Sequence, residues 1–164
     1  MNLLVRIILV LGILGMSNVL KGAEIKDKIR QIAKVESNYS DSYVNLLLVI
    51  AQTETGIQQI NSRLDKDIGI FQIYYKEIER EGWDKEALES QVGYQIYIAS
   101  KIIRRKYMEC KKRYDLTWIA CYNSATPSFH NRYWLKLKQS ARYLKIDLMK
   151  ELKVVDKRLA SSLH

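Results

Sequence analysis

The chain has 164 residues and a formal net charge of +9, with 27 Lys and Arg against 18 Asp and Glu. This length allows one domain in addition to a targeting segment, and no repeat, low-complexity tract or linker indicates a second domain. The basic charge predicts attraction to anionic surfaces such as lipid headgroups, nucleic acid or a carboxylate-bearing cell wall. No binding motif supports nucleic acid as the partner.

The first 23 residues have the layout of a secretory signal peptide. A basic start is followed by an apolar stretch of ten residues, Ile7–Met16, and by a polar exit with small residues that ends at Ala23. The apolar core is short for a membrane span. Lys21 stands where a small residue is usual before a cleavage site, so an uncleaved anchor is the alternative. We therefore expect export, with the domain covering residues 24–164.

Only one proline and seven glycines punctuate the chain, which favours long helices. The expected helices, in chain order, cover residues 24–35, 41–54, 74–81, 85–112, 116–121, 128–144 and 147–155. Their expected N-caps are Ser40 or Asp41, Asp84 and Asp115, and Gly82 is the expected stop of the third helix. Residues 57–73 form the irregular part. The fold class is therefore an all-α globule interrupted by one loop or small hairpin around residues 57–73.

The two cysteines, Cys110 and Cys121, are candidates for a disulfide. An even cysteine count in an exported protein indicates a bridge. The two residues lie on successive expected helices joined by a tight turn, so antiparallel packing would bring their Cα atoms within about 7 Å. The alternative is two buried thiols that pack as small apolar groups. This spacing matches no metal site, and we expect no bound metal.

Glu54 stands at the end of a segment that is apolar around most of a helical circumference. Residues 44–51 are aliphatic apart from Asn45, so this helix belongs in the domain interior. Burial favours the neutral form of a carboxyl group, and the negative end of the helix dipole acts in the same direction. The pattern predicts an acid with a raised pKa that is suited to donating a proton. The alternative is a glutamate that caps the helix and faces water.

Two further segments accompany the one that contains Glu54. The three segments read AQTETG over residues 51–56, DIGIFQI over residues 67–73 and ACYNSA over residues 120–125. They resemble the three motifs of the lysozyme-like lytic transglycosylases, the SLT-domain family, whose usual forms are E-S-G, G-L-M-Q-I and A-Y-N-x-G. The resemblance runs from about Ile25 to Tyr143. The DIG start of the second motif is most similar to the small specialised members associated with type III, type IV and conjugative secretion systems.

This resemblance implies a lysozyme-like α+β fold and a glycan lyase in the periplasm or cell envelope. Glu54 would first donate a proton to the bond between N-acetylmuramic acid and N-acetylglucosamine. It would then remove the proton of the muramic acid C6 hydroxyl, which gives a 1,6-anhydro sugar without consuming water. The resemblance implies no cofactor. Its implied partners are peptidoglycan glycan strands and components of a secretion or conjugation apparatus, with membrane contact only if the N-terminal segment stays uncleaved.

The resemblance also implies a set of substrate-binding residues. They are Thr55, Ile70, Phe71, Gln72, Tyr122 and Asn123. The Gln72 amide suits a sugar N-acetyl group or the cleft backbone, and its alternative role is to tie the loop to the helix. Tyr122 would orient Glu54 or contact the sugar, or else be a core aromatic. Asn123 suits bracing of the loop backbone.

The remaining positions depart from the motifs or match them loosely. Ile70 and Phe71 replace leucine and methionine; they would form an apolar wall for a sugar ring, or be core. Thr55 keeps the hydroxyl of the usual serine. Tyr133 and Tyr143 fall where the family tends to have cleft tyrosines.

Three alternatives to a lyase stay open at this point. A hydrolytic muramidase usually needs a second carboxylate, for which Asp65 and Asp67 are the nearest candidates. A non-catalytic wall-binding assembly protein is favoured only by Phe71 and by Ala125, which stands where a glycine is common. A basic helical protein that binds membrane or nucleic acid rests on charge alone.

Overall fold

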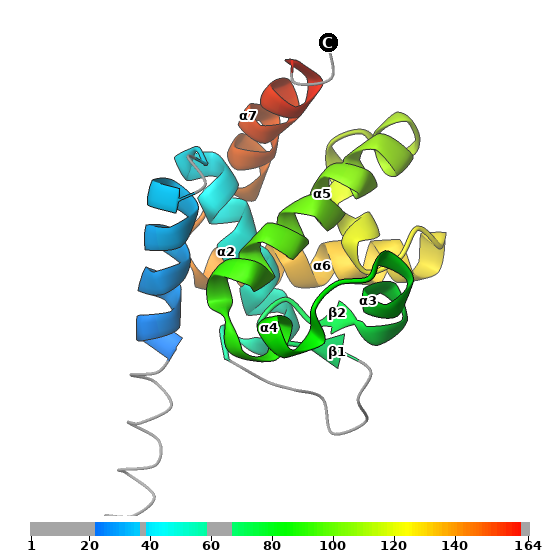
Figure 1. The fold of residues 1–164 in the computed structure, drawn as a ribbon. Helices are drawn as coiled ribbons and strands as arrows, with labels where there is room; N and C mark the ends of the chain where they lie inside the picture. The colour runs from blue at the N-terminus through cyan, green and yellow to red at the C-terminus, as the bar shows by residue number, and fades with distance from the viewer. Residues whose placement is uncertain (1–21, 37–38, 59–66, 162–164) are drawn as a thin grey trace, which may run out of the picture.

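Helices make up most of the structure, a computed structural model that describes residues 22–36, 39–58 and 67–161 (Figure 1). The elements are a helix over residues 22–31 continued by the π-helix η1 (Ile32–Glu36), α2 (Asp41–Thr55), β1 (Asp67–Ile68), β2 (Ile73–Tyr74), α3 (Tyr75–Glu81), α4 (Lys85–Ser90), α5 (Val92–Tyr114), the 3₁₀ helix η2 (Asp115–Tyr122), α6 (Pro127–Tyr143) and α7 (Leu148–Ser161). The mainly helical class with a small hairpin is as expected. Most of the expected signal peptide lies outside the described residues.

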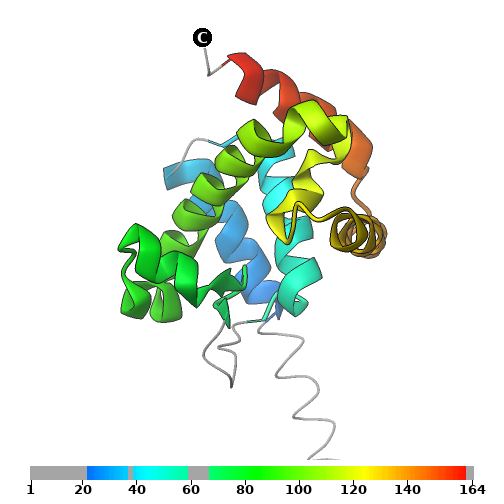
Figure 2. The same cartoon turned by 90° about the vertical axis from the view of Figure 1, so that its right-hand side faces the viewer.

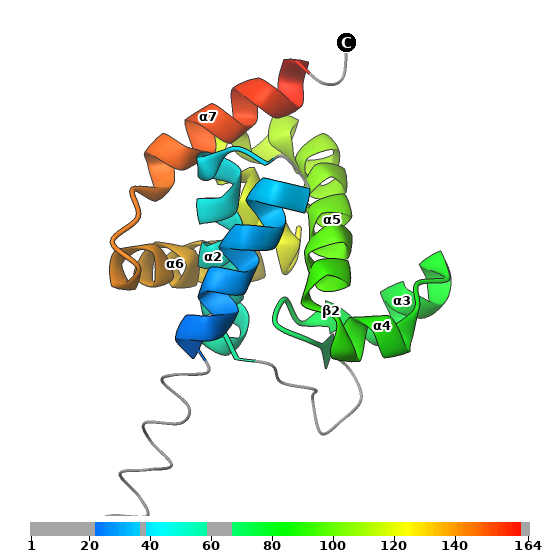
Figure 3. The same ribbon diagram turned by 60° about the vertical axis from the view of Figure 1, so that its left-hand side comes forward.

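The central helix is α2, and its burial follows from its apolar circumference. Eight of its residues are buried: Tyr43, Val44, Leu46, Leu47, Leu48, Val49, Ile50 and Ala51. A helix that is apolar on every side needs neighbours on every side. The first helix, α5, α6 and α7 surround it in Figures 1 and 3, and η1, α6 and α7 contact it directly. The expected Ser40 cap is present, since its hydroxyl accepts a hydrogen bond from the Tyr43 N–H at 3.3 Å.

The expected single helix over residues 85–112 was wrong, because the chain breaks at Gln91. The Asp84 carboxylate caps α4 as expected, accepting from the Ala87 N–H at 3.0 Å. Gln91 then adopts extended backbone, with φ −114° and ψ 108°. One turn into α5, the Gln95 side chain donates to the Leu88 carbonyl at 2.7 Å and ties the two helices together. The break is stabilised by this tertiary hydrogen bond and not by a helix-breaking residue at position 90 or 91.

A disulfide between Cys110 and Cys121 joins α5 to η2, with the Cα atoms 6.6 Å apart, as the sequence favoured. It holds η2 across the end of α5. Asp115 does not cap η2 as expected: it is the first residue of that helix, and its carboxylate accepts from the Lys111 ammonium at 2.8 Å. Figure 2 looks nearly along α6 and shows η2 and part of α2 between α6 and α5.

The hairpin, α3 and α4 lie together at one end of the molecule (Figures 1 and 3). The hairpin pairs β1 and β2 antiparallel, with Asp67 opposite Tyr74 and Ile68 opposite Ile73. As expected, α3 stops at Gly82, which has a positive φ of 66°. Among the described helices, none combines the length and the apolar character that a bilayer crossing requires.

Candidate active site

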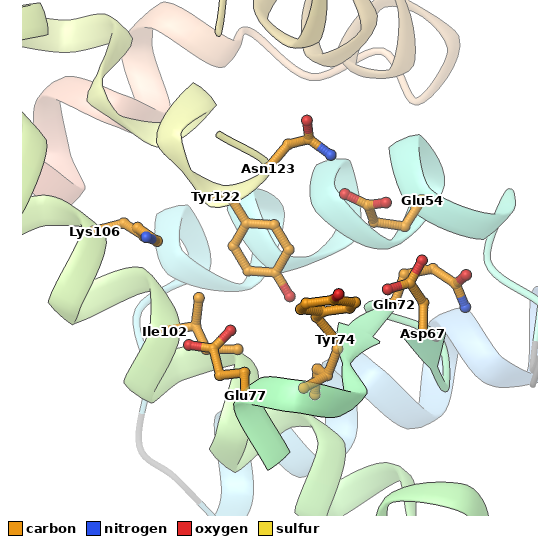
Figure 4. Close-up of a pocket in the computed structure, with 10 residues that line it drawn as sticks. Glu54, Asp67, Gln72, Tyr74, Glu77, Ile102, Lys106, Tyr122 and Asn123 are labelled. Atoms are coloured by element: carbon orange, nitrogen blue, oxygen red, sulfur yellow. The ribbon is translucent and has the colours of Figure 1, made fainter. Parts of the chain in front are cut away.

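A pocket of about 320 Å³ lies where the end of α2 meets the hairpin, α5 and the end of η2 (Figure 4). Its lining residues are Glu54, Asp67, Gln72, Ile73, Tyr74, Glu77, Ile102, Lys106, Tyr122 and Asn123. The three motif segments, which are far apart in the chain, each contribute to this one pocket. The fold therefore brings together Glu54, Gln72, Tyr122 and Asn123, as the sequence predicted.

The Glu54 carboxyl group lies in the last turn of α2, partly buried at the pocket wall. Its Oε1 accepts a hydrogen bond from the hydroxyl of Tyr133, which comes from α6. Burial raises the pKa of Glu54 from 4.5 to about 7; the Tyr133 hydrogen bond lowers this pKa, the nearby Asp67 charge raises it, and Lys136 lowers it. Near neutral pH the group is therefore divided between its acid and carboxylate forms, as the sequence pattern predicts.

Tyr133 contacts Glu54 directly, although the sequence indicated a role for it only through a loose match to the cleft tyrosines of the resembled family. It is 4% exposed, and its pKa lies well above the usual value because of burial and the Glu54 charge. Tyr143, the other loosely matched tyrosine, is 74% exposed and does not line the pocket. The sequence did contain a pattern that indicates burial of this tyrosine. Tyr133, Leu137 and Ala141 recur every four residues and all lie on the buried face of α6.

The hairpin is held to α5 by the fully buried side chain of Gln95. Its Oε1 accepts from the Ile70 N–H at 2.8 Å, while its amide nitrogen bonds to the Leu88 carbonyl. Gly69 has φ +75°, and a Cβ there would lie 2.5 Å from Gln95 Oε1. Only glycine fits both the backbone angle and this close approach.

Gln72 lines the pocket and also performs the structural role that the sequence left open. Its side-chain amide donates to the Gly69 carbonyl at 2.8 Å, which closes the turn of the hairpin. Its own φ is positive, at 47°. The bond to the backbone fixes the side chain at the edge of the pocket.

The side chains of Ile70 and Phe71 do not face the pocket, which corrects the sequence prediction. Both are fully buried, because packing into the core removes their apolar surface from water. Their backbone carbonyls, and not their side chains, contact the other motif residues. The Ile70 carbonyl lies 3.1 Å from the Thr55 hydroxyl, and the Phe71 carbonyl accepts from the Tyr122 hydroxyl at 3.0 Å. Thr55 likewise is not part of the pocket lining; it connects α2 to the hairpin.

Tyr122 crosses the pocket without bonding to Glu54. Figure 4 shows its ring between Asn123 and Tyr74, with the hydroxyl directed toward the hairpin. Burial raises the pKa of Tyr122 well above its usual value, and the Glu54 charge adds to this shift. Asn123 is exposed beside Glu54 at the pocket mouth.

Other pocket residues were missed by the sequence analysis. Ile102 and Lys106 come from α5, where their spacing of four residues places them on one helix face. Glu77 comes from α3 and forms an ion pair with Arg105. Asp67, considered as a second carboxylate, does line the pocket, whereas Asp65 lies outside the described residues.

Comparisons with protein-family models, with curated proteins and with solved structures find no match to this chain. The chemistry of the site is therefore argued from its geometry. An acid with a pKa of about 7 and a second carboxylate face a solvent-connected pocket, and a buried tyrosine behind the acid fixes its carboxyl group. Such an arrangement can give a proton to a bound ligand and take one back.

Replacing Gly69 and Gly82 by alanine separates backbone strain from the Gln95 contact. Both glycines have a positive φ, but a Cβ at Gly82 meets nothing within 4 Å. We expect Gly82→Ala to lower the unfolding free energy by about 1 kcal/mol, the cost of left-handed backbone. Gly69→Ala should cost about 2 kcal/mol more, because buried hydrogen bonds of Gln95 are also disrupted. Equal losses for the two variants in urea unfolding would contradict this account of the hairpin.

Replacing Glu54 by glutamine should change stability in a pH-dependent way. A carboxyl with a folded-state pKa above its unfolded value contributes stability below about pH 4.5 that is lost as pH rises through about 7. Glu54→Gln cannot ionise, so we expect it to match the wild type near pH 4 and to exceed it at pH 8 by on the order of 3 kcal/mol. Urea unfolding at both pH values measures this.

The matched control for this comparison is Glu79→Gln, at an exposed position on α3. It should leave the pH dependence of stability unchanged. A Glu54→Gln variant whose stability difference from the wild type is the same at pH 4 and pH 8 would show that the Glu54 pKa is not raised.

Proposed function

We propose that the protein is a peptidoglycan lytic transglycosylase that cleaves the β-1,4 bond between N-acetylmuramic acid and N-acetylglucosamine and leaves a 1,6-anhydro end. The observation that carries the proposal is the Glu54 carboxyl group, which has a pKa of about 7 and lies at a pocket that all three motif segments line. The mainly helical architecture with a small hairpin is compatible with the lysozyme-like fold that this function implies.

The chemistry requires one group that acts first as an acid and then as a base. Protonated Glu54 gives its proton to the glycosidic oxygen as the bond from C1 to that oxygen breaks. The carboxylate then takes the proton from the C6 hydroxyl of the muramic acid, while that oxygen forms a bond to C1. The proton lost in the first step is regained in the second, and no water is consumed. A pKa near neutrality suits both steps, because neither form of the acid is strongly favoured.

Tyr133 has a positioning role in this mechanism. Its hydroxyl donates to one oxygen of Glu54 and so fixes the orientation of the carboxyl group. The same bond stabilises the carboxylate that forms after the first proton transfer. Tyr122 and Gln72 shape the pocket through their bonds to hairpin carbonyls.

The proposed setting is the cell envelope. The signal-peptide pattern of residues 1–23 supports export, and the basic charge supports attraction to an anionic wall. The resemblance of the DIG segment to members associated with secretion and conjugation supports local wall opening for such an apparatus.

A second candidate, a hydrolytic muramidase, is favoured by one observation. Asp67 lines the same pocket as Glu54, close enough for its charge to raise the Glu54 pKa. In hydrolysis a second carboxylate either activates water or forms a bond to the sugar. The muramidase therefore requires Asp67 for catalysis, whereas the lyase does not.

Digestion of purified peptidoglycan, followed by mass spectrometry of the products, tests the proposal. The wild type should release muropeptides one water lighter than hydrolysis products, and Glu54→Gln should lower the rate by at least about a hundredfold, because the proton donor is lost. Asp67→Asn should keep the anhydro products. It should move the alkaline limit of activity to lower pH, since removing the Asp67 charge lowers the Glu54 pKa.

Three other results would contradict the proposed lyase. Reducing-end products that disappear in Asp67→Asn would establish the muramidase. Unchanged digestion by Glu54→Gln would remove Glu54 from the chemistry altogether. Binding of the wild-type protein to the wall without any digestion would contradict both enzymatic candidates.

A further inference from the structure

A second pocket, of about 340 Å³, adjoins the candidate active site over α3 and α5. It shares Tyr74, Glu77 and Lys106 with the first pocket, so the two pockets are direct neighbours. Its remaining lining residues are Lys76, Arg80, Arg105 and Glu109. We call this second depression the basic pocket.

The two neighbouring pockets differ in charge. The lining of the basic pocket has four cationic side chains and two carboxylates, a formal balance of +2, or +1 when Glu81, which pairs with Arg80 and Arg105, is counted. The first pocket has three carboxyl groups, those of Glu54, Asp67 and Glu77, against the single cation of Lys106. A ligand that spans both pockets with a negative group at one end is therefore oriented by this difference.

The cations on the α5 side are held in place by their acidic neighbours. Arg105 is ion-paired with Glu77, and its Nε lies 3.7 Å from a carboxylate oxygen of Glu109. Lys106 bonds to the other oxygen of Glu109 at 3.0 Å. The side chains of Arg105 and Lys106 are only 25% and 23% exposed, so less conformational freedom remains to be lost when a ligand binds.

The cations on the α3 side form the opposite rim. Arg80 lies 3.5 Å from Glu77 and 2.7 Å from Glu81, and its side chain remains 63% exposed. Lys76 is exposed one turn earlier on the same helix. Spaced by four residues, the two side chains lie on one face of α3 and can reach the same bound group.

From this arrangement we propose that the basic pocket binds a carboxylate of the peptide stem attached to muramic acid. The inference rests on the proposed function and adds a substrate preference to it. The N-acetylated sugars of the glycan are uncharged, so the stem peptide is the part of the polymer that supplies anions. Glu54 and Asp67 repel this branch, whereas the net positive charge of the basic pocket attracts it. Guanidinium groups are well suited to carboxylates because they can bond to both oxygens. The protein should therefore prefer glycan strands whose stem peptides have free carboxylates.

Two substrates prepared from the same peptidoglycan test this preference: uncrosslinked strands with their stem peptides, and the same strands after their stem carboxylates have been converted to neutral amides. Removing the stems with an amidase would not serve, because hydrolysis of that amide leaves a lactyl carboxylate on each muramic acid. We expect the wild type to cleave the strands with free stem carboxylates about threefold to tenfold faster, because each partly exposed charge contact contributes little binding free energy. Lys76→Gln with Arg80→Gln should bring this ratio close to one. The preference should also shrink in 0.5 M salt, where the Debye length is only about 4 Å.

The matched control combines Lys101→Gln with Arg104→Gln, which removes two exposed charges from α5 outside the basic pocket. This variant should keep the wild-type ratio. If the α3 double variant does not fold, Lys76→Gln alone provides the comparison. A ratio that stays at the wild-type value in the pocket variants, or that falls equally in the control, would overturn the inference.

Binding to the Glu54→Gln variant distinguishes failure of this inference from failure of the proposed function. The probes are a disaccharide with its tetrapeptide and the same molecule with its tetrapeptide carboxylates converted to amides, titrated calorimetrically. Tighter binding of the probe with free carboxylates that is lost on replacing Lys76 and Arg80 supports the basic pocket, even if the wild type cleaves neither strand. Equal binding of the two probes, or binding of neither, contradicts it.

Discussion

The contact between the Tyr133 hydroxyl and the Glu54 carboxyl group joins α6 to the end of the central helix, and the chemistry of the site depends on it. Two opposing effects meet there. Burial disfavours the charged carboxylate, while the tyrosine hydrogen bond favours it. The pKa remains at about 7, well above 4.5, so burial is the larger effect. The hydrogen bond keeps the proton available for transfer and holds the carboxyl group in one orientation.

The rest of the fold holds this acid in place and builds the pocket in front of it. The apolar circumference of α2 buries this helix in the core, and its last turn therefore holds Glu54 partly buried. On one side the Cys110–Cys121 disulfide anchors η2, which carries Tyr122 at its end. On the other side Gln95 anchors the hairpin through the Ile70 N–H. The bond from Tyr122 to the Phe71 carbonyl joins these two sides. Each wall of the pocket therefore has a separate support.

The sequence predicted the parts of the molecule that are specified locally. The Ser40 cap and the apolar run that follows it define α2, and Gly82 ends α3 because its positive φ suits glycine. The position of Glu54 at the end of a buried helix was also enough to predict a raised pKa. In these cases the determining residues lie within a few positions of the feature.

The parts that could not be predicted depend on contacts between distant segments. The break at Gln91 is stabilised by the Gln95 side chain and not by a local signal. Tyr133 meets Glu54 across 79 positions of the chain. The inward orientation of Phe71 is set by the turn of the hairpin, which neither alternation nor helical periodicity describes.

The proposed chemistry requires that Glu54, while bonded to Tyr133, has a pKa near neutrality and so exchanges its proton there. An NMR titration of the ¹³C-labelled Glu54 carboxyl carbon, in the wild type and in Tyr133→Phe, measures this directly. The account predicts a midpoint near pH 7 in the wild type. It predicts a higher midpoint in the variant, because loss of a donor to the carboxylate favours the neutral acid. A wild-type midpoint near 4.5 that does not move in Tyr133→Phe would contradict it.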